Sequence, residues 1–294
     1  MRNHPGAGRQ GPVRSSGFVA AVQLTRPRNC LLTAISVWVG AVTSGGPHAT
    51  AAVVFAAAGA AAIAAAGNGM NDVIDLQTDR LNRATRPLPS GRLSAGVALA
   101  LSSLLGVTGL ALAFLAGLLP GMIAFAVVVG LALYNWFLKR VGLAGNLLVS
   151  LIAATTFPYG AAAAGGWGRW WIPALFAVGY HLARELVKGV EDTEGDRLAG
   201  VRPVARIYGD HRACRSAAVL LALVGLAAPL PVLLDIYGLA YLALVGLLDV
   251  FLASIVLSLW SGNPGGRRLS PRLLLGMALG LVAIVLGEIL ARPH

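Results

Sequence analysis

The stretch from Ser94 to Leu115 reads SAGVALALSSLLGVTGLALAFL and contains no charged residue. It is longer than the roughly 20 apolar residues with which an α-helix crosses a hydrocarbon core about 30 Å thick. Its apolar residues are continuous and do not alternate with polar ones, which favours a helix over a strand of a membrane barrel. The stretch therefore indicates a transmembrane helix.

Similar apolar runs occur along the whole chain. Hydrophobic residues make up 57% of the 294 residues and charged residues only 12%, and the mean hydropathy is +0.75. A soluble domain has about 25% charged residues. We therefore predict an all-α, polytopic membrane protein with nine transmembrane helices. The expected spans are 30–45, 49–67, 94–115, 119–137, 145–165, 167–187, 214–231, 237–260 and 273–290.

The N-terminal segment is basic and rich in glycine and proline, and it does not resemble the short basic start and apolar stretch of a signal peptide. We expect residues 1–20 to form a mobile tail and residues 21–294 to form one transmembrane domain. Cys30 and Cys214 are isolated in the sequence. They lack the spacing of a metal site or a disulfide framework, so structural burial is their expected role.

The positive charges follow the membrane topology. The net charge is +11, yet 21 of the 23 Lys and Arg residues fall in the N-terminus and in alternate loops, and only Arg169 and Arg292 fall elsewhere. This distribution follows the positive-inside rule and argues against a nucleic-acid partner. It predicts a cell-membrane protein with a cytoplasmic N-terminus and a C-terminus on the opposite side. Some of these cations are expected to attract anionic membrane lipids.

Eight of the twelve acidic residues fall in two short windows, 72–79 and 185–196. Both windows lie at the expected cytoplasmic ends of even-numbered spans, so they can face one site. The residues of each window that share a helical face are three or four positions apart. The two stripes are Asn68, Asp72, Asp75 and Asp79, and Glu185, Lys188, Asp192 and Asp196.

Two facing carboxylate stripes beside a bilayer need a cation between them, because unpaired they would repel and be costly to desolvate. Oxygen donors select hard cations, and Mg²⁺ favours a few carboxylates completed by water and phosphate oxygens. A diphosphate ligand fits this pattern best. The structural alternative is a charged, solvated loop, which the doubled and face-aligned arrangement disfavours. Asp235 is expected to be a solvated loop residue, whereas Asp249 and Glu288 are either functional or form interhelical hydrogen bonds.

These motifs resemble the signatures of the UbiA superfamily of intramembrane prenyltransferases. The first is Asn71-Asp72-x-x-Asp75-x-x-x-Asp79 followed by Arg86-Pro87-Leu88-Pro89-Ser90-Gly91, and the second runs from Arg184-Glu185 and Lys188 to Glu191-Asp192-x-Glu194-Gly195-Asp196. The similarity extends to Arg26-Pro27-x-Asn29-Cys30, Tyr134, Leu138-Lys139-Arg140 and Gly145-Asn146.

The resemblance implies nine helices around a central cavity and Mg²⁺-dependent ionisation of a prenyl diphosphate, followed by transfer of the allylic cation to a lipophilic acceptor. The strings RPxNC, NRxxRPLPSG and EDxEGD are most similar to the branch that transfers a geranylgeranyl group to the hydroxyl of a geranylgeranylglyceryl phosphate-type lipid. An aromatic acceptor of quinone biosynthesis is the alternative. A transporter or channel would predict acids near mid-span, and a non-catalytic homologue remains a further alternative.

The resemblance also assigns roles. Asp72, Asp75 and Asp79 would hold one Mg²⁺, and Asp192 with Asp196 a second. Asn68 and Asn71 would complete a metal shell or orient a carboxylate, and Asn29 would contact substrate. Arg86, Lys139 and Lys188 would bind phosphate oxygens, unless they serve topology or lipid headgroups. Tyr134 would stabilise the carbocation through its ring or belong to an aromatic belt. The expected catalytic residues are Asp72, Asp75, Asp192, Asp196 and Tyr134.

One position departs from the pattern. The family branch usually has an acidic residue where this chain has Gly189. Either Asp192 and Asp196 suffice for the second metal, or Glu185 and Glu191 assist, or activity is weakened. His181, one turn before Glu185, is expected to serve helix packing, with deprotonation of the acceptor as the alternative.

Overall fold

The computed structural model describes residues 17–191, 204–261 and 269–291, and over these ranges it contains helices and no strand. The fold class predicted from the sequence is therefore confirmed. The helices are α1 (Gly17–Thr25), α2 (Pro27–Thr43), α3 (Ala51–Ile74), α4 (Leu76–Asn82), α5 (Ala95–Ala116), α6 (Leu118–Trp136), η1 (Leu138–Arg140), α7 (Leu143–Ala154), α8 (Thr156–Ala164), α9 (Trp171–Glu191), α11 (Val204–Tyr208), α12 (Asp210–Ala227), α13 (Leu230–Leu233), α14 (Leu239–Trp260) and α15 (Ser270–Ala291).

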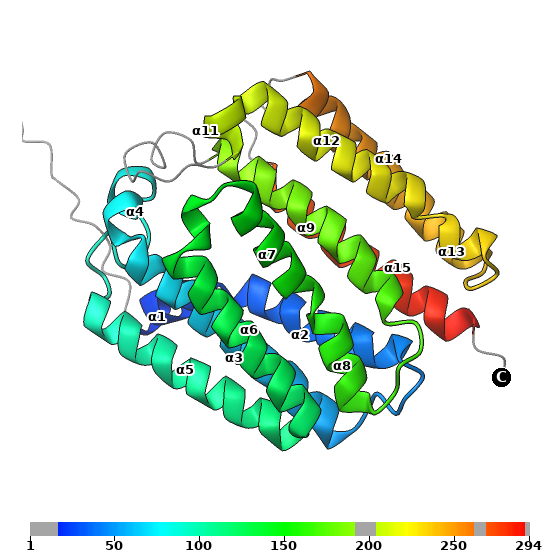
Figure 1. The fold of residues 1–294 in the computed structure, drawn as a ribbon, viewed down its shortest axis with the longest axis horizontal. Coiled ribbons are helices and arrows are strands. Elements are labelled where there is room, and N and C mark those ends of the chain that lie inside the picture. The colour runs from blue at the N-terminus through cyan, green and yellow to red at the C-terminus, as the bar shows by residue number, and fades with distance from the viewer. Residues whose placement is uncertain (1–16, 192–203, 262–268, 292–294) are drawn as a thin grey trace, which may run out of the picture.

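Six helices form a closed ring. In the order α2, α3, α6, α7, α9 and α15, each helix contacts the next, and α15 returns to α2. The other long helices pack outside this ring: α5 lies against α3 and α6, α12 against α9, and α14 against α12 and α15. Figure 1 shows α5 along one side of the bundle and α12 with α14 along the other. The ring encloses the site described below.

Seven helical segments are long and apolar enough to cross a membrane, within the part of the chain that the structure describes. They are 51–74, 95–116, 118–136, 143–164, 210–233, 239–260 and 270–291. The two remaining predicted spans correspond to α2, which has 17 residues, and to α9, whose last turns carry Arg184, Glu185 and Lys188. The chain is thus a multi-pass membrane protein, and the number of nine spans stays a prediction.

The predicted span 145–165 is broken into α7 and α8. Thr155 separates the two helices, and Pro158 follows three residues later. Proline lacks an N–H and its ring crowds the carbonyl of the residue four positions earlier, so a helix kinks or breaks before it. The break lies at the ring's inner face, because Thr155 and Thr156 line the central cavity.

The proposed boundary of the N-terminal tail at residue 20 falls inside α1. Ala20 and Leu24 of this short helix are fully buried, and α1 contacts both α2 and α3. Residues 1–16 lie outside the described residues. The extent of the tail therefore stays a prediction, and the helical domain begins no later than Gly17.

Glycine allows α2 and α8 to pack backbone against backbone. A Cβ atom at Gly160 would lie 1.8 Å from the Val37 carbonyl oxygen, and one at Gly40 would lie 2.2 Å from the Phe157 carbonyl oxygen. Helices in membranes commonly approach through small residues, since lipid offers no hydrophobic drive for association. This contact fixes the distance between α2, which belongs to the ring, and α8, which continues from α7.

We expect Gly160→Ala to lower the thermal stability of the purified protein in detergent, because the added methyl group must push α8 away from α2. Overpacking of this kind costs about 1–3 kcal/mol. Gly246→Ala in α14 is the matched control, since a Cβ there meets nothing within 4 Å, and it should leave the melting temperature unchanged or slightly higher. Equal melting temperatures for the two variants would contradict the close contact.

Candidate active site

A cavity of about 290 Å³ lies inside the ring. One part of its wall is polar and comes from the beginning of α2 and the ends of α3, α6 and α9. The rest is mainly apolar and comes from the middle of the same helices and of α7. The polar residues are Arg26, Asn29, Asn68, Asn71, Tyr134, Arg184, Glu185 and Lys188, and the apolar ones include Ala60, Ile63, Ala64, Ile123, Val127, Leu131 and Ile152. Such a cavity suits a molecule with a charged head and an apolar chain.

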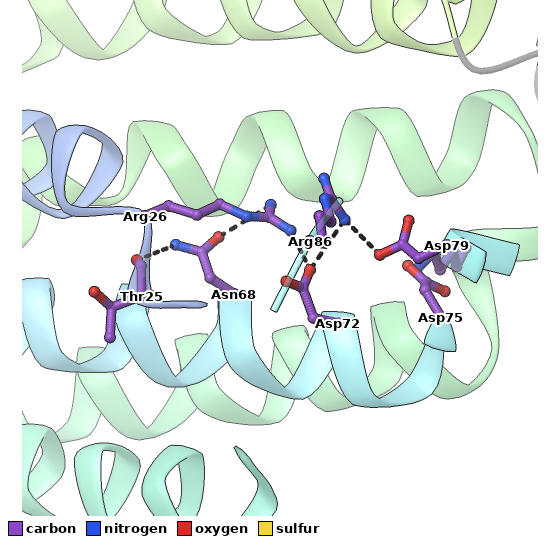
Figure 2. A network of polar contacts seen from close by, with 8 residues as sticks. Thr25, Arg26, Asn68, Asp72, Asp75, Asp79 and Arg86 are labelled. Carbon is purple, nitrogen blue, oxygen red and sulfur yellow. Dashed lines mark hydrogen bonds and ion pairs between the residues drawn. The ribbon is translucent and has the colours of Figure 1, made fainter. Parts of the chain in front are cut away.

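The first acidic stripe follows the end of α3 into α4. Asp75 ends α3, and its backbone N–H still bonds to the Asn71 carbonyl at 2.8 Å, while the Asp79 N–H bonds to the Asp75 carbonyl at 2.8 Å. The helical path therefore continues with only a local change of direction. Asn68, Asp72, Asp75 and Asp79 lie along one side of this path, as Figure 2 shows. The shared face expected from their spacing is present.

Two arginines from outside the helix neutralise Asp72. Oδ1 of Asp72 accepts hydrogen bonds from Nη2 of Arg26 and, at 3.1 Å, from Nη1 of Arg86 (Figure 2). The Asp72 side chain is only 5% exposed. A buried carboxylate needs such partners, because an isolated charge in a poorly solvated place is strongly destabilising.

Arg86 also bridges Asp72 to Asp79. Nη1 of Arg86 lies 2.5 Å from Oδ2 of Asp79, so one guanidinium holds two carboxylates that are two helical turns apart. Burial raises the pKa of Asp79 above its ordinary value, and the positive charge of Arg86 opposes that rise. Burial likewise lowers the pKa of Arg86, whereas Asp72 and Asp79 raise it. The bridge fixes the segment between α4 and α5 against the acidic stripe.

Lys139 provides the third cation. It belongs to η1, and its Nζ forms an ion pair with Oδ2 of Asp75. η1 packs closely on α7, since a Cβ at Gly145 would lie 2.4 Å from the Leu138 carbonyl oxygen. Gly145 therefore positions the short segment that carries Lys139. This gives a physical reason for the glycine singled out in the sequence.

The turn between α1 and α2 directs Arg26 toward the stripe. Arg26 has a left-handed backbone conformation, with φ 53° and ψ 68°, directly before Pro27 at the start of α2. Nδ2 of Asn68 donates to the Thr25 carbonyl at 3.0 Å, and Nη1 of Arg26 lies 3.5 Å from Oδ1 of Asn68 (Figure 2). Asn68 thus donates a hydrogen bond to a carbonyl that lacks a helical partner at the end of α1. This hydrogen bond links the turn to α3.

The side-chain oxygen of Asn71 is available as a metal ligand near the stripe. Its Oδ1 is buried and has no hydrogen-bond partner among the described residues, and Asn71 lines the cavity. A buried carbonyl oxygen without a partner is costly unless a ligand, water or ion completes it. Together with the carboxylates of Asp72, Asp75 and Asp79, it forms a set of hard oxygen donors that fits Mg²⁺ in chemical type.

The second stripe is described only as far as Glu191. Nζ of Lys188 donates to both carboxylate oxygens of Glu185, at 2.7 and 2.8 Å, and Arg184 lies 3.6 Å from the same carboxylate. All three residues line the cavity opposite α3. Asp192 and Asp196, the predicted ligands of a second metal, lie outside the described residues. The structure therefore brings Asn68 of the first stripe, with Asn71, and Glu185 and Lys188 of the second stripe to one cavity, whereas Asp72, Asp75 and Asp79 are not among its lining residues.

The cations that balance the described carboxylates belong to the chain itself. Each aspartate of the first stripe is bonded to arginine or lysine, and no group of three acidic, histidine or cysteine side chains is arranged as a metal cluster within residues 17–191, 204–261 and 269–291. The oxygen donors fit Mg²⁺ in kind, but arginine or lysine partners hold one oxygen of each of the three carboxylates. The metal-ligand roles stay predictions.

Glu191 has a different task from the one considered in the sequence. Its carboxylate accepts hydrogen bonds from the backbone N–H groups of Leu269 and Ser270, at 2.6 and 3.1 Å, and from the Ser270 hydroxyl at 2.5 Å. It therefore caps the first turn of α15, where N–H groups lack helical partners. Assistance to a second metal is not the role that these contacts support.

Several residues of the cavity were not foreseen as site residues. Arg26 had appeared only within a motif, and its side chain contacts Asp72 because of a backbone turn that no periodicity reveals. His181, assigned to helix packing, lines the central cavity and also a second cavity of about 90 Å³ beside α14. Asp249 lines that second cavity, Glu288 lies 3.7 Å from Arg169, and Asp235 is exposed. The remaining unforeseen lining residues include Thr33, Ser36, Thr155, Thr156 and Tyr159.

Comparison with known proteins gives one consistent result. Residues 31–274 match the UbiA prenyltransferase family. Digeranylgeranylglyceryl phosphate synthase of Ignicoccus hospitalis is 38% identical over 94% of each chain, and that of Halobacterium salinarum is 36% identical over 91% of this chain and 96% of its own. A UbiA homologue from Archaeoglobus fulgidus, solved with GPP and Mg²⁺, has the same fold, with a TM-score of 0.68 at 17% identity over 92% of this chain and 99% of its own. Because the family match extends over most of the chain and both curated relatives align along nearly their whole length, the chain belongs to the UbiA prenyltransferase family.

Proposed function

We propose that this chain is a digeranylgeranylglyceryl phosphate synthase, which transfers a geranylgeranyl group from its diphosphate to the hydroxyl of a geranylgeranylglyceryl phosphate lipid. The observation that carries the proposal is the cavity, whose polar end is lined by Asn68 and Asn71 of the first motif, by Glu185 of the second and by the cations Arg26, Arg184 and Lys188, and which continues into apolar walls. Arg26 also holds Asp72 beside this end of the cavity. The names of the relatives at 36–38% identity support the choice of substrates.

The polar end suits the head group of the donor. Arg26, Lys139 and Lys188 come from three different elements, and with Arg86 they offer N–H donors to the oxygens of a diphosphate. The apolar walls from α3, α6 and α7 suit the isoprenoid chain, whose burial is favourable in proportion to its apolar area. The fold neighbour solved with GPP and Mg²⁺ supports a donor of this class.

We assign one metal ion to each acidic stripe. Asp72, Asp75 and Asp79, with the free Oδ1 of Asn71, would hold one Mg²⁺, and Asp192 with Asp196 a second. Bound there, Mg²⁺ supplies positive charge that stabilises the departing diphosphate without proton transfer. The chain's own contribution is to hold the phosphate oxygens through its cations and to keep the allylic carbon in a cavity with few polar neighbours, where water cannot quench the cation.

We assign the interaction with the reacting carbon to Tyr134. It lies at the end of α6, lines the cavity, and is separated from Lys139 by only four residues. An aromatic face within about 6 Å of a cation contributes roughly 0.5–2 kcal/mol. We therefore propose that Tyr134 stabilises the allylic cation next to the phosphate-binding lysine.

The polar end of the cavity would face the cytoplasm. The distribution of Lys and Arg over the loops supports this orientation, in which the C-terminus lies on the opposite side. A soluble, charged diphosphate head would then be bound and released at the cytoplasmic face, while both isoprenoid chains remain within the bilayer.

The proposal is tested by product analysis. We expect purified protein in lipid nanodiscs, incubated with radiolabelled geranylgeranyl diphosphate and geranylgeranylglyceryl phosphate, to form the doubly prenylated lipid only when Mg²⁺ or Mn²⁺ is present. Hydroxybenzoate and dihydroxynaphthoate serve as competing acceptors in parallel reactions. If product forms only with an aromatic acceptor, the lipid is not the acceptor. Undiminished turnover in excess chelator would contradict the metal-dependent mechanism.

We expect Asp72→Asn and Asp192→Asn each to abolish transfer, because each replaces a proposed anionic metal ligand by a neutral group of the same shape. The loss should be at least about 100-fold, as for removal of a group that stabilises transition-state charge. Asp235→Asn is the matched control: Asp235 is exposed in a loop with φ 55°, a conformation that asparagine tolerates. Activity near that of the unchanged protein in the Asp72 or Asp192 variant at saturating Mg²⁺ would refute the assignment.

A further inference from the structure

The cations proposed to hold diphosphate are all bonded to carboxylates of the same site. Arg86 contacts Asp72 and Asp79, Lys139 contacts Asp75, and Lys188 contacts Glu185. Arg26, which no sequence motif had marked as a binding residue, contacts Asp72 in the same way. The carboxylates that would bind the metal and the cations that would bind the phosphate are thus paired with each other.

These pairs occupy carboxylate oxygens that a metal could use. Oδ1 of Asp72 accepts from two guanidinium groups, and a carboxylate oxygen has only two lone pairs to offer. Oδ2 of Asp75 is held by Lys139. A divalent ion that binds through these oxygens has to displace Arg26 from Asp72 and Lys139 from Asp75.

The displaced cations need a new anion. The side chains of Arg26 and Lys139 are only 31% and 19% exposed, so bulk water replaces their carboxylate partners poorly. Removing one partner of a buried ion pair leaves an uncompensated charge and is strongly destabilising. Arg26 lines the cavity, and Asp72 is not among the lining residues. A phosphate group in the cavity is therefore within reach of Arg26 once Arg26 leaves Asp72.

We propose that the magnesium diphosphate binds by an exchange of counter-ions, in which Arg26 and Lys139 pass from Asp72 and Asp75 to phosphate oxygens while these carboxylates take the metal. The inference rests on the proposed function and assigns Arg26 and Lys139 a different partner in the presence of the ligand. It makes metal and diphosphate binding interdependent, because each ligand releases the charges that the other needs. By thermodynamic linkage, the factor by which diphosphate tightens metal binding equals the factor by which metal tightens diphosphate binding.

The exchange predicts opposite effects on the two ligands when a cation is removed. Without the competing cation, the metal alone should bind more tightly, since one cation fewer competes for its carboxylate ligand. The diphosphate should bind more weakly, since it loses a charge-assisted contact. Removal of a residue that only stabilises the fold would weaken the binding of both ligands. Removal of a residue that only binds phosphate would leave the affinity for metal in the absence of diphosphate unchanged.

The test measures free Mn²⁺ by electron paramagnetic resonance during titration of the full chain in nanodiscs, with and without geranylgeranyl S-thiolodiphosphate, a donor analogue that ionises slowly. The variants are Arg26→Asn, chosen because asparagine tolerates the left-handed backbone of residue 26, and Lys139→Gln. Arg26→Lys is the charge-conserving variant. Arg272→Gln is the matched control: Arg272 is at the beginning of α15, and its contacts are to the Ser254 hydroxyl at 2.7 Å and the Phe251 ring.

We expect the analogue to tighten Mn²⁺ binding to the unchanged protein by at least about tenfold, the factor that corresponds to one charge-assisted hydrogen bond. In Arg26→Asn and Lys139→Gln, Mn²⁺ alone should bind about tenfold more tightly and the analogue about tenfold more weakly. Arg26→Lys should restore much of the interdependence. Arg272→Gln should behave as the unchanged protein, which separates the local exchange from a general change of surface potential.

Unchanged or weaker binding of Mn²⁺ alone to the two variants would overturn the exchange, as would an equal shift in Arg272→Gln. If Arg26→Asn does not fold, Lys139→Gln still decides, since it removes a different cation from a different element. If the unchanged protein binds neither Mn²⁺ nor the analogue, alone or together, the result contradicts the proposed function instead. Binding of both ligands without interdependence would contradict only the exchange.

Discussion

The neutralisation of three carboxylates at the end of an apolar helix bundle is the constraint on which the polar half of this structure depends. Asp72 and Asp79 are buried, and Asp75 is largely buried, beside helices that consist almost entirely of apolar residues. Each of the three cations that balance them comes from an irregular segment. Arg26 belongs to the turn between α1 and α2, Arg86 to the segment after α4, and Lys139 to η1. The breaks in the helical pattern are therefore the parts that complete the site.

The same constraint explains which features could be predicted from the sequence. The apolar runs define most of the helices, and the spacing of Asp72, Asp75 and Asp79 gives their shared face, because both depend on local periodicity. The contacts of the left-handed turn at Arg26 are with α3, more than 40 positions away, and the bridge formed by Arg86 requires a loop that folds back on residues 7 and 14 positions earlier. The role of Glu191 is of this second kind, since its partners Leu269 and Ser270 are 78 and 79 positions away. The break of the fifth predicted span was not predicted, although Pro158 is a local signal for it.

Of the two helices that fall short of the criteria for a membrane span, α2 has only 17 residues, whereas α9 is long enough but carries charged residues of the site. α9 is interrupted near its end by Arg184, Glu185 and Lys188, and these are the residues that line the cavity. Charged groups within a span are costly and are retained where they face the interior of a bundle. The mean hydropathy of a helix depends on its composition and ignores the contacts of its residues. Charged residues therefore lower it even when, as here, they form ion pairs with one another. A shortfall in hydropathy within an otherwise regular pattern of spans is thus a sign of function.

The apolar half of the cavity follows a separate rule. On α3, the residues that line it recur at helical spacing, and three of them, Ala60, Ala64 and Gly67, have little or no side chain. They leave space where larger residues would fill the ring, while the contact through Gly40 and Gly160 holds α2 and α8 next to each other. The room for isoprenoid chains is therefore set by small residues in mid-membrane, and the chemistry by charged residues at the helix ends. Because these two groups lie at different depths, the length of the chains that fit can vary among such proteins without any change in the acidic motifs.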